Sequence, residues 1–185
     1  MKTKTILMLI ILAIATFSLT AQTEQKKYCN EIYNVNYGDV IRIVNSKNKF
    51  NADTVHFYQN NLNDICNCDP RFIGGLPILE KVMKSVFPIE KRKALADTVN
   101  RKRIILFLCY DDSTGQILNI KFWLYGVTLS DEESFYDVTI KEIYQLETQL
   151  KAQRLKVDDC TCPKNKYGFA TFLMPLNRMD EWDSE

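Results

Sequence analysis

Six cysteines are the residues of this 185-residue chain best suited to covalent or metal chemistry. Four of them form two motifs of equal spacing, Cys66-Asn67-Cys68 and Cys160-Thr161-Cys162, and the others are Cys29 and Cys109. In exported chains an even number of cysteines is typical of a disulfide framework. The N-terminal residues, described below, predict that this chain is exported. Several connectivities are open, and the equal spacing favours the interpretation that the two Cys-x-Cys motifs join each other.

A metal centre and a redox site are the alternatives for the Cys-x-Cys motifs. Four thiolates would suit zinc, but structural zinc sites usually have roughly two to four residues between paired cysteines. Oxidoreductases place Cys-x-x-Cys at a helix start, whereas here Asp69 and Asp158-Asp159 adjoin the motifs and disfavour thiolates. We therefore expect disulfides, with no metal ligand and no cofactor. Cys109 lies in an apolar run, so a buried thiol and a bridge to Cys29 are both open.

One histidine, His56, is available for acid–base or nucleophilic chemistry. No Gly-x-Ser-x-Gly turn and no glycine-rich phosphate loop occurs in the chain. The carboxylates of Asp111-Asp112 and Glu132-Glu133 already have structural interpretations, in a turn and a helix cap. We therefore expect no enzyme and no catalytic residues, and an enzyme that uses His56 is the third of three functional hypotheses.

Two short basic runs, residues 91–93 and 101–103, and one tryptophan are candidates for binding. A patch for anionic glycans or phosphates is one interpretation of the basic runs, and a solvated helix face is the commoner one. For the tryptophan, packing beneath the N-terminal third is favoured over a binding role. The candidate binding residues are Lys91, Arg92, Lys93, Arg101, Arg103 and Trp123. With 24 Lys and Arg against 23 Asp and Glu, bulk charge does not indicate a nucleic-acid partner.

Residues 1–21 are predicted to be an export signal. Lys2 and Lys4 precede an apolar run from Ile6 to Phe17, and Ala21 is a small residue at the expected cut. The run is about 12 residues long, shorter than the roughly 20 that a membrane-spanning helix needs. No cysteine follows it closely enough for lipid attachment. The sequence therefore predicts a periplasmic or secreted protein, with no membrane span after cleavage and no lipoprotein anchor.

Hydrophobic periodicity predicts the elements that must position these residues. The clearest signal is a hairpin whose strands are joined by the turn Asp111–Gly115. A capping box at Ser130–Glu133 is expected ahead of the last helix. The predicted helices are 76–87, 90–99 and 138–154, and the predicted strands are 40–44, 54–58, 103–110, 116–125 and 167–174.

These elements predict a single α+β domain, a small antiparallel sheet with two helices packed on one face. The domain comprises residues 22–185. Within it, residues 26–70 extend the sheet, residues 76–176 form an α-β-β-α-β core, and residues 177–185 are an acidic tail. The oligomeric state is left open.

This element order, with the Asp111-x-x-x-Gly115 turn and a capped second helix, resembles the C-terminal domain of TonB and its relatives over roughly residues 76–176. The resemblance implies a non-enzymatic interaction module whose protein or peptide partner binds at a sheet edge. As a whole, with Ala21-Gln22 at the end of its signal, the chain also resembles small secreted Bacteroidota proteins of unknown function. The alternative function is a small-ligand or inhibitor-like module with a pocket between helix and sheet.

Overall fold

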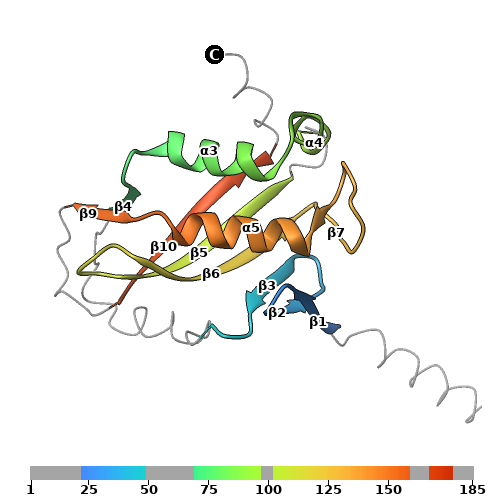
Figure 1. The fold of residues 1–185 in the computed structure, drawn as a ribbon, viewed down its shortest axis with the longest axis horizontal. Coiled ribbons are helices and arrows are strands. Elements are labelled where there is room, and N and C mark those ends of the chain that lie inside the picture. The colour runs from blue at the N-terminus through green and yellow to red at the C-terminus, as the bar shows by residue number, and fades with distance from the viewer. Residues whose placement is uncertain (1–21, 49–68, 97–101, 159–166, 177–185) are drawn as a thin grey trace, which may run out of the picture.

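The computed structural model describes residues 22–48, 69–96, 102–158 and 167–176 (Figure 1). Several predictions fall outside these residues: the export signal, the strand 54–58 with His56, Arg101, both Cys-x-Cys motifs and the acidic tail. Among the described residues, no helix combines the length and the apolar character needed to cross a membrane.

Six described strands form one antiparallel sheet in the order β1-β2-β3-β6-β5-β10. The N-terminal strands β1 to β3 continue the sheet beside β6, and β10 forms the opposite edge (Figure 1). The predicted α+β class with an antiparallel sheet is confirmed. The strands are β1 (Thr23–Tyr28), β2 (Glu31–Asn36), β3 (Ile41–Asn45), β5 (Arg103–Asp111), β6 (Ile117–Tyr125) and β10 (Tyr167–Pro175).

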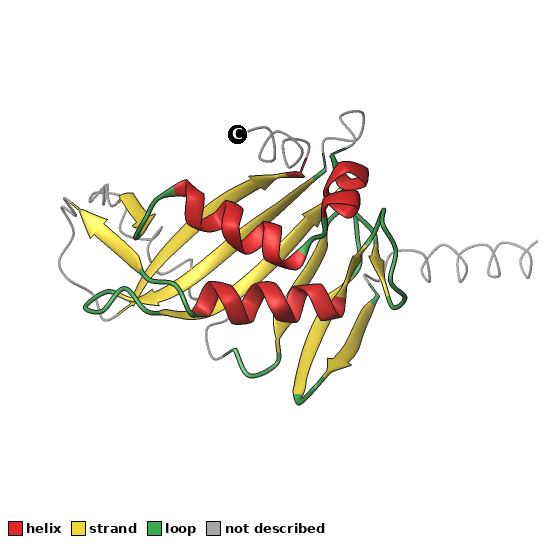
Figure 2. Ribbon diagram, turned by 45° about the horizontal axis from the view of Figure 1, so that its top comes forward, coloured by secondary structure: helices red, strands yellow, loops and turns green. Residues whose placement is uncertain are grey.

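Helices α3 (Leu76–Val86) and α5 (Ile140–Lys151) lie side by side over one face of the sheet, and the short α4 (Ile89–Leu95) follows α3 (Figure 2). Pro77 stands in the first turn of α3, where its missing N–H costs no helical hydrogen bond. Both long helices bury residues spaced three and four apart, which is the apolar stripe that the sequence predicts. Those residues are Leu79, Val82, Met83 and Val86 in α3, and Ile140, Ile143, Leu146 and Leu150 in α5.

Alternate residues of the central strands complete the core under these helices. Ile104, Leu106 and Leu108 of β5 are at most 1% exposed, as are Phe122 and Leu124 of β6. Because successive side chains of a strand point to opposite faces, this period of two directs one face to the helices. The other face carries the intervening residues.

The prediction of a capping box at Ser130–Glu133 is wrong. The box is formed instead by Thr139 and Glu142, because the strand pair β7 (Leu129–Ser130) and β8 (Val138–Thr139) carries the extended chain up to Thr139. The Thr139 hydroxyl accepts the Glu142 N–H, and the Glu142 carboxylate accepts the Thr139 N–H. The Ser130 hydroxyl accepts only the Glu132 N–H, within the preceding loop.

A second, two-stranded sheet joins the entrance of α3 to the exit of α5. It pairs β4 (Asp69–Phe72) with β9 (Leu155–Asp158) in antiparallel register, with Asp69 opposite Asp158. The β5–β6 turn packs against this sheet, because the carbonyl of Gly115 accepts the N–H of Leu155. The turn itself is held by the Asp111 carboxylate, which accepts hydrogen bonds from the backbone N–H groups of Ser113 and Thr114.

Candidate functional site

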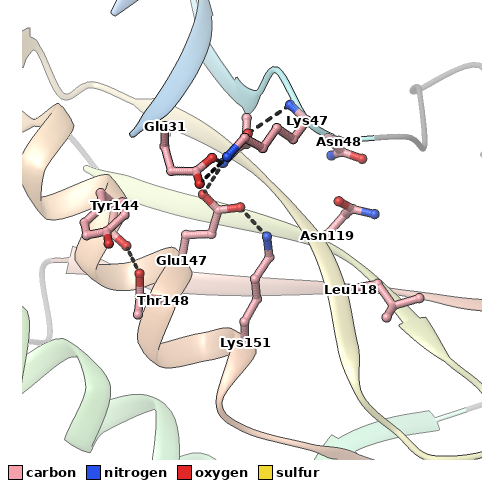
Figure 3. Close-up of a pocket in the computed structure, with 10 residues that line it drawn as sticks. Glu31, Lys47, Asn48, Leu118, Asn119, Tyr144, Glu147, Thr148 and Lys151 are labelled. Atoms are coloured by element: carbon pink, nitrogen blue, oxygen red, sulfur yellow. Dashed lines mark hydrogen bonds and ion pairs between the residues drawn. The ribbon is translucent and has the colours of Figure 1, made fainter. Parts of the chain in front are cut away.

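A polar pocket of about 430 Å³, here called the Glu147 pocket, opens between the N-terminal hairpin strands and α5 (Figure 3). Side chains from β2, from β3 and the residues after it, from the start of β6 and from α5 line it. The pocket exists because β3 ends at Asn45, which leaves the first residues of β6 without a neighbouring β3 residue.

The Glu147 carboxylate is buried in the wall of this pocket, with only 4% of the residue exposed. It accepts hydrogen bonds from the Tyr33 hydroxyl at 2.6 Å, Asn45 Nδ2 at 3.2 Å and Lys151 Nζ at 2.7 Å. These donors come from β2, β3 and α5, so one carboxylate ties the helix to two strands. Buried charges are tolerated only when they are paired and hydrogen-bonded in this way.

A second carboxylate, that of Glu31, lies at the rim. Lys47 Nζ donates to it at 2.8 Å (Figure 3). Asn45 Nδ2 donates to Glu31 at 2.9 Å as well as to Glu147, and so bridges the two carboxylates. The hydrogen bonds from Lys47 and then Asn45 hold the pKa of Glu31 below its usual value. Burial, and next the bond to Glu147, raises the pKa of Tyr33 well above its usual range. The arrangement is chemically suited to holding a polar molecule by hydrogen bonds.

The outer edge of β10 is the second candidate site. One residue beyond the strand, Leu176 donates its backbone N–H to the Lys102 carbonyl at 3.1 Å. Because bonded and non-bonded pairs alternate along an antiparallel ladder, the even-numbered residues of β10 bond to β5. Thr171 and Leu173, which are odd-numbered, therefore direct their N–H and C=O groups away from β5. We call these outward groups the β10 edge.

The two outer strands of the sheet differ in composition. All nine residues of β10 are uncharged, and Leu173 is 55% exposed. By contrast, β1 carries Glu24, Lys26 and Lys27, and charges of this kind protect natural edges from further pairing. Pro175 falls at an outward position of β10, where its missing N–H removes no bond to β5. Within the described residues, β10 pairs only with β5.

Two of the predicted basic binding residues are not on the surface. Lys91 is 5% exposed and its Nζ lies 2.7 Å from a carboxylate oxygen of Glu142. Arg92 is 6% exposed and donates to the carbonyl of Phe87 at 2.8 Å, at the end of α3. The prediction that both contribute to a binding patch is therefore wrong, because the face of α4 that carries Lys91 and Arg92 packs against α3 and α5. Lys93 is exposed.

Trp123 and Arg103 lie on the sheet face opposite the helices. The Arg42 guanidinium stands 5.0 Å from the Trp123 ring centroid, and the Phe107 ring stands 4.4 Å from it. Arg103 lies 4.6 Å over the Tyr125 ring. The described N-terminal strands extend the same sheet and form no layer over Trp123. The sequence does not reveal these cation–π pairs, because the partners of Trp123 come from β3 and β5 through the strand register.

The two described cysteines both carry free thiols. Cys29 is exposed between β1 and β2, whereas Cys109 is 4% exposed within β5. Burial raises the pKa of the Cys109 thiol to about 11, so this thiol stays protonated at neutral pH. The structure thus forms no bridge between them, and Cys109 fills space as a small apolar residue.

In the part of the chain that the structure describes, no cluster of three or more His, Cys, Asp or Glu side chains is placed to hold a metal ion. No local pattern in the sequence indicates the residues of the Glu147 pocket. In the sequence, Glu147 is one of several polar residues of an amphipathic helix. Only the pairing of β2 with β3 brings Tyr33 and Asn45 close to it. The apolar run of β10 was visible, but its position at the edge was not.

These features define an α+β protein with one helical layer on an antiparallel sheet, a polar pocket beside the helix and an uncharged edge strand. A crystal structure of a DUF5043 family protein from Bacteroides uniformis ATCC 8492 has a similar fold, with a TM-score of 0.55 and 15% identity. The similarity covers 84% of this chain and 86% of that protein. Neither a family model nor a curated protein matches the sequence.

At this identity the likeness concerns the fold alone. It agrees with the expected resemblance to Bacteroidota proteins of unknown function. The resemblance to TonB C-terminal domains is not confirmed by the comparisons.

Proposed function

We propose that this protein is a non-enzymatic interaction module that binds an extended polypeptide along the β10 edge. The observation that carries the proposal is an uncharged nine-residue edge strand that pairs only with β5 among the described strands, with the N–H and C=O groups of Thr171 and Leu173 directed outward. A peptide added as a seventh strand would satisfy these groups by backbone hydrogen bonds.

The composition of the edge supports a partner of apolar or mixed sequence. On the sheet face opposite the helices, the small Thr171 lies between Phe169 and Leu173. Side chains of a bound strand would lie beside these residues at cross-strand distance, where apolar pairs stabilise a sheet. The β1 edge lacks this character, because its lysines and glutamate would hinder an added strand.

A proline at an outward position tests this proposal. Thr171→Pro removes an outward N–H without removing a bond to β5, so the fold is expected to persist. The probe is a fluorescein-labelled peptide of alternating Thr and Val with Lys at both ends, followed by fluorescence anisotropy. We expect Thr171→Pro to weaken its binding at least about tenfold, which corresponds to roughly 1.4 kcal/mol.

The matched control is Gln25→Pro, which places proline at an outward position of the opposite edge. The alternation of β1 follows from the Tyr37 N–H, which donates to the Gln22 carbonyl at 3.0 Å. This variant is expected to bind the peptide as the unsubstituted protein does. Equal binding by the Thr171→Pro variant, or no measurable binding by the unsubstituted protein, would refute the proposal.

We further propose that the protein is exported, is cleaved after Ala21 and joins its two Cys-x-Cys motifs by disulfides. Cleavage there retains Gln22 and all of β1. The register of β4 and β9 supports the pairing, because Asp69 lies opposite Asp158. One motif lies within three residues before Asp69 along the chain, and the other lies within four residues after Asp158. Bridges that close a loop of this size contribute about 4 kcal/mol each.

Mass spectrometry of the exported protein without reductant tests the export and the pairing. We expect a mature chain that begins at Gln22, and alkylation under denaturing conditions that modifies only Cys29 and Cys109. Tryptic digestion is expected to leave the peptide 50–71 linked to the peptide 157–164, and reduction is expected to separate them. Alkylation of all six cysteines before reduction would contradict the disulfides but not the peptide-binding proposal.

A further inference from the structure

In the wall of the Glu147 pocket, the polar groups already have hydrogen-bond partners. At its rim, several polar groups can still make further hydrogen bonds. The wall carboxylate receives three hydrogen bonds, from Tyr33, Asn45 and Lys151. An ammonium group has three N–H donors, and Lys47 and Lys151 each use one in the bonds described above. Lys47 is 66% exposed and Lys151 is 34% exposed, so their remaining donors are accessible from the pocket.

Two further groups add hydrogen-bonding capacity of both kinds. The Thr148 hydroxyl donates to the Tyr144 carbonyl at 2.8 Å, which leaves the lone pairs of its oxygen to accept. The Asn119 amide, on β6 across the pocket from α5, offers both a donor and an acceptor (Figure 3). A ligand in this pocket therefore meets donors and acceptors side by side, as a molecule with several hydroxyl groups requires.

The charges of the pocket balance. Glu31 and Glu147 carry two negative charges, and Lys47 and Lys151, which lie against them, carry two positive charges. An added anion would face the carboxylates, and an added cation would face the ammonium groups, so neither gains a net attraction. This balance favours a neutral ligand.

An apolar surface completes the lining. Tyr144 and Leu118 border the same space (Figure 3). Tyr144 is held in place by the Tyr28 ring, whose centroid lies 5.2 Å away. A sugar ring has one face of C–H groups and a periphery of hydroxyls, and these match an aromatic surface bordered by amides and ammonium groups. The volume of about 430 Å³ is within the range of small-ligand pockets.

We propose that the Glu147 pocket binds a neutral polyhydroxylated ligand, a saccharide of one or two rings. The pocket and the β10 edge are built from different strands, so this inference does not rest on the peptide-binding proposal.

The test is a titration of isotope-labelled protein with glucose, galactose, N-acetylglucosamine, maltose and cellobiose, each followed by amide chemical shifts. We expect at least one sugar to shift the amides of Asn119, Thr148 and Lys151 in a saturable way. Asn119→Ala is expected to weaken this binding about fivefold, because a neutral hydrogen bond contributes about 1 kcal/mol. Added salt is expected to change the affinity little, because the ligand is neutral.

The matched control is Asn36→Ala, which removes an amide from the opposite sheet face of β2 and is expected to leave the affinity unchanged. Sodium acetate and ethylamine serve as the anionic and cationic probes. The proposal is wrong if none of the five sugars gives saturable shifts at concentrations well above the millimolar range. It is equally wrong if acetate or ethylamine binds in their place, or if Asn119→Ala leaves sugar binding unchanged while the fold persists.

Discussion

Replacement of Glu147 by alanine is expected to lower the free energy of unfolding by about 3 kcal/mol, because buried hydrogen-bonding groups lose their partner. The substitution leaves the buried Tyr33 hydroxyl without its acceptor and removes one partner of Asn45. It also leaves Lys151 without its ion-pair partner and opens a cavity at the base of the pocket. The measurement is urea unfolding followed by tryptophan fluorescence and circular dichroism.

Glu133→Ala is the matched control for this change. Glu133 also accepts from a lysine at 2.7 Å, Lys141, but its side chain is 81% exposed. Exposed ion pairs contribute little to stability, so the midpoint of unfolding is expected to stay nearly unchanged. If both glutamate variants unfold at the same urea concentration, the Glu147 network does not tie α5 to the N-terminal strands.

Gly115→Ala is expected to lower the free energy of unfolding by about 3 kcal/mol. The φ angle of Gly115 is 68°, in the left-handed region that costs other residues about 1 kcal/mol or more. A Cβ there would stand 1.9 Å from the Leu155 carbonyl oxygen, which is backbone and has little freedom to move. The turn must therefore separate from β9, and the melting temperature is expected to fall by roughly 10 °C.

Gly38→Ala provides the comparison within the same chain. Its φ is not in the left-handed region, and the nearest atom to an added Cβ is the Val40 oxygen at 3.9 Å. Thermal unfolding by calorimetry is expected to give nearly the same melting temperature for this variant and the unsubstituted protein. If the Gly115→Ala variant has the same melting temperature as these two proteins, the contact between the turn and Leu155 can relax without loss of stability.

The helices and central strands were predictable because their signals are local. The apolar stripe of residues 76–87 predicted α3, and the alternation in residues 116–125 predicted β6, each to within one residue. The capping box of α5 was misplaced because Ser130–Glu133 and Thr139–Glu142 have equivalent capping patterns. The parallel pairing of β7 with β8, which involves tertiary contacts, selected the second. The strand β1 was missed, since its first five residues are all polar and show no alternation of apolar and polar side chains.

The sequence by itself determined the α+β class, the hairpin with its Asp111–Gly115 turn and the two long helices. Each depends on hydrophobic period or turn chemistry within a short window. Only the tertiary structure decided which strand forms an uncharged edge and which basic residues are buried. Only it placed Tyr33 and Asn45 around Glu147, more than a hundred residues away along the chain. These outcomes depend on strand order and register, which arise from long-range packing and leave no local pattern in the sequence.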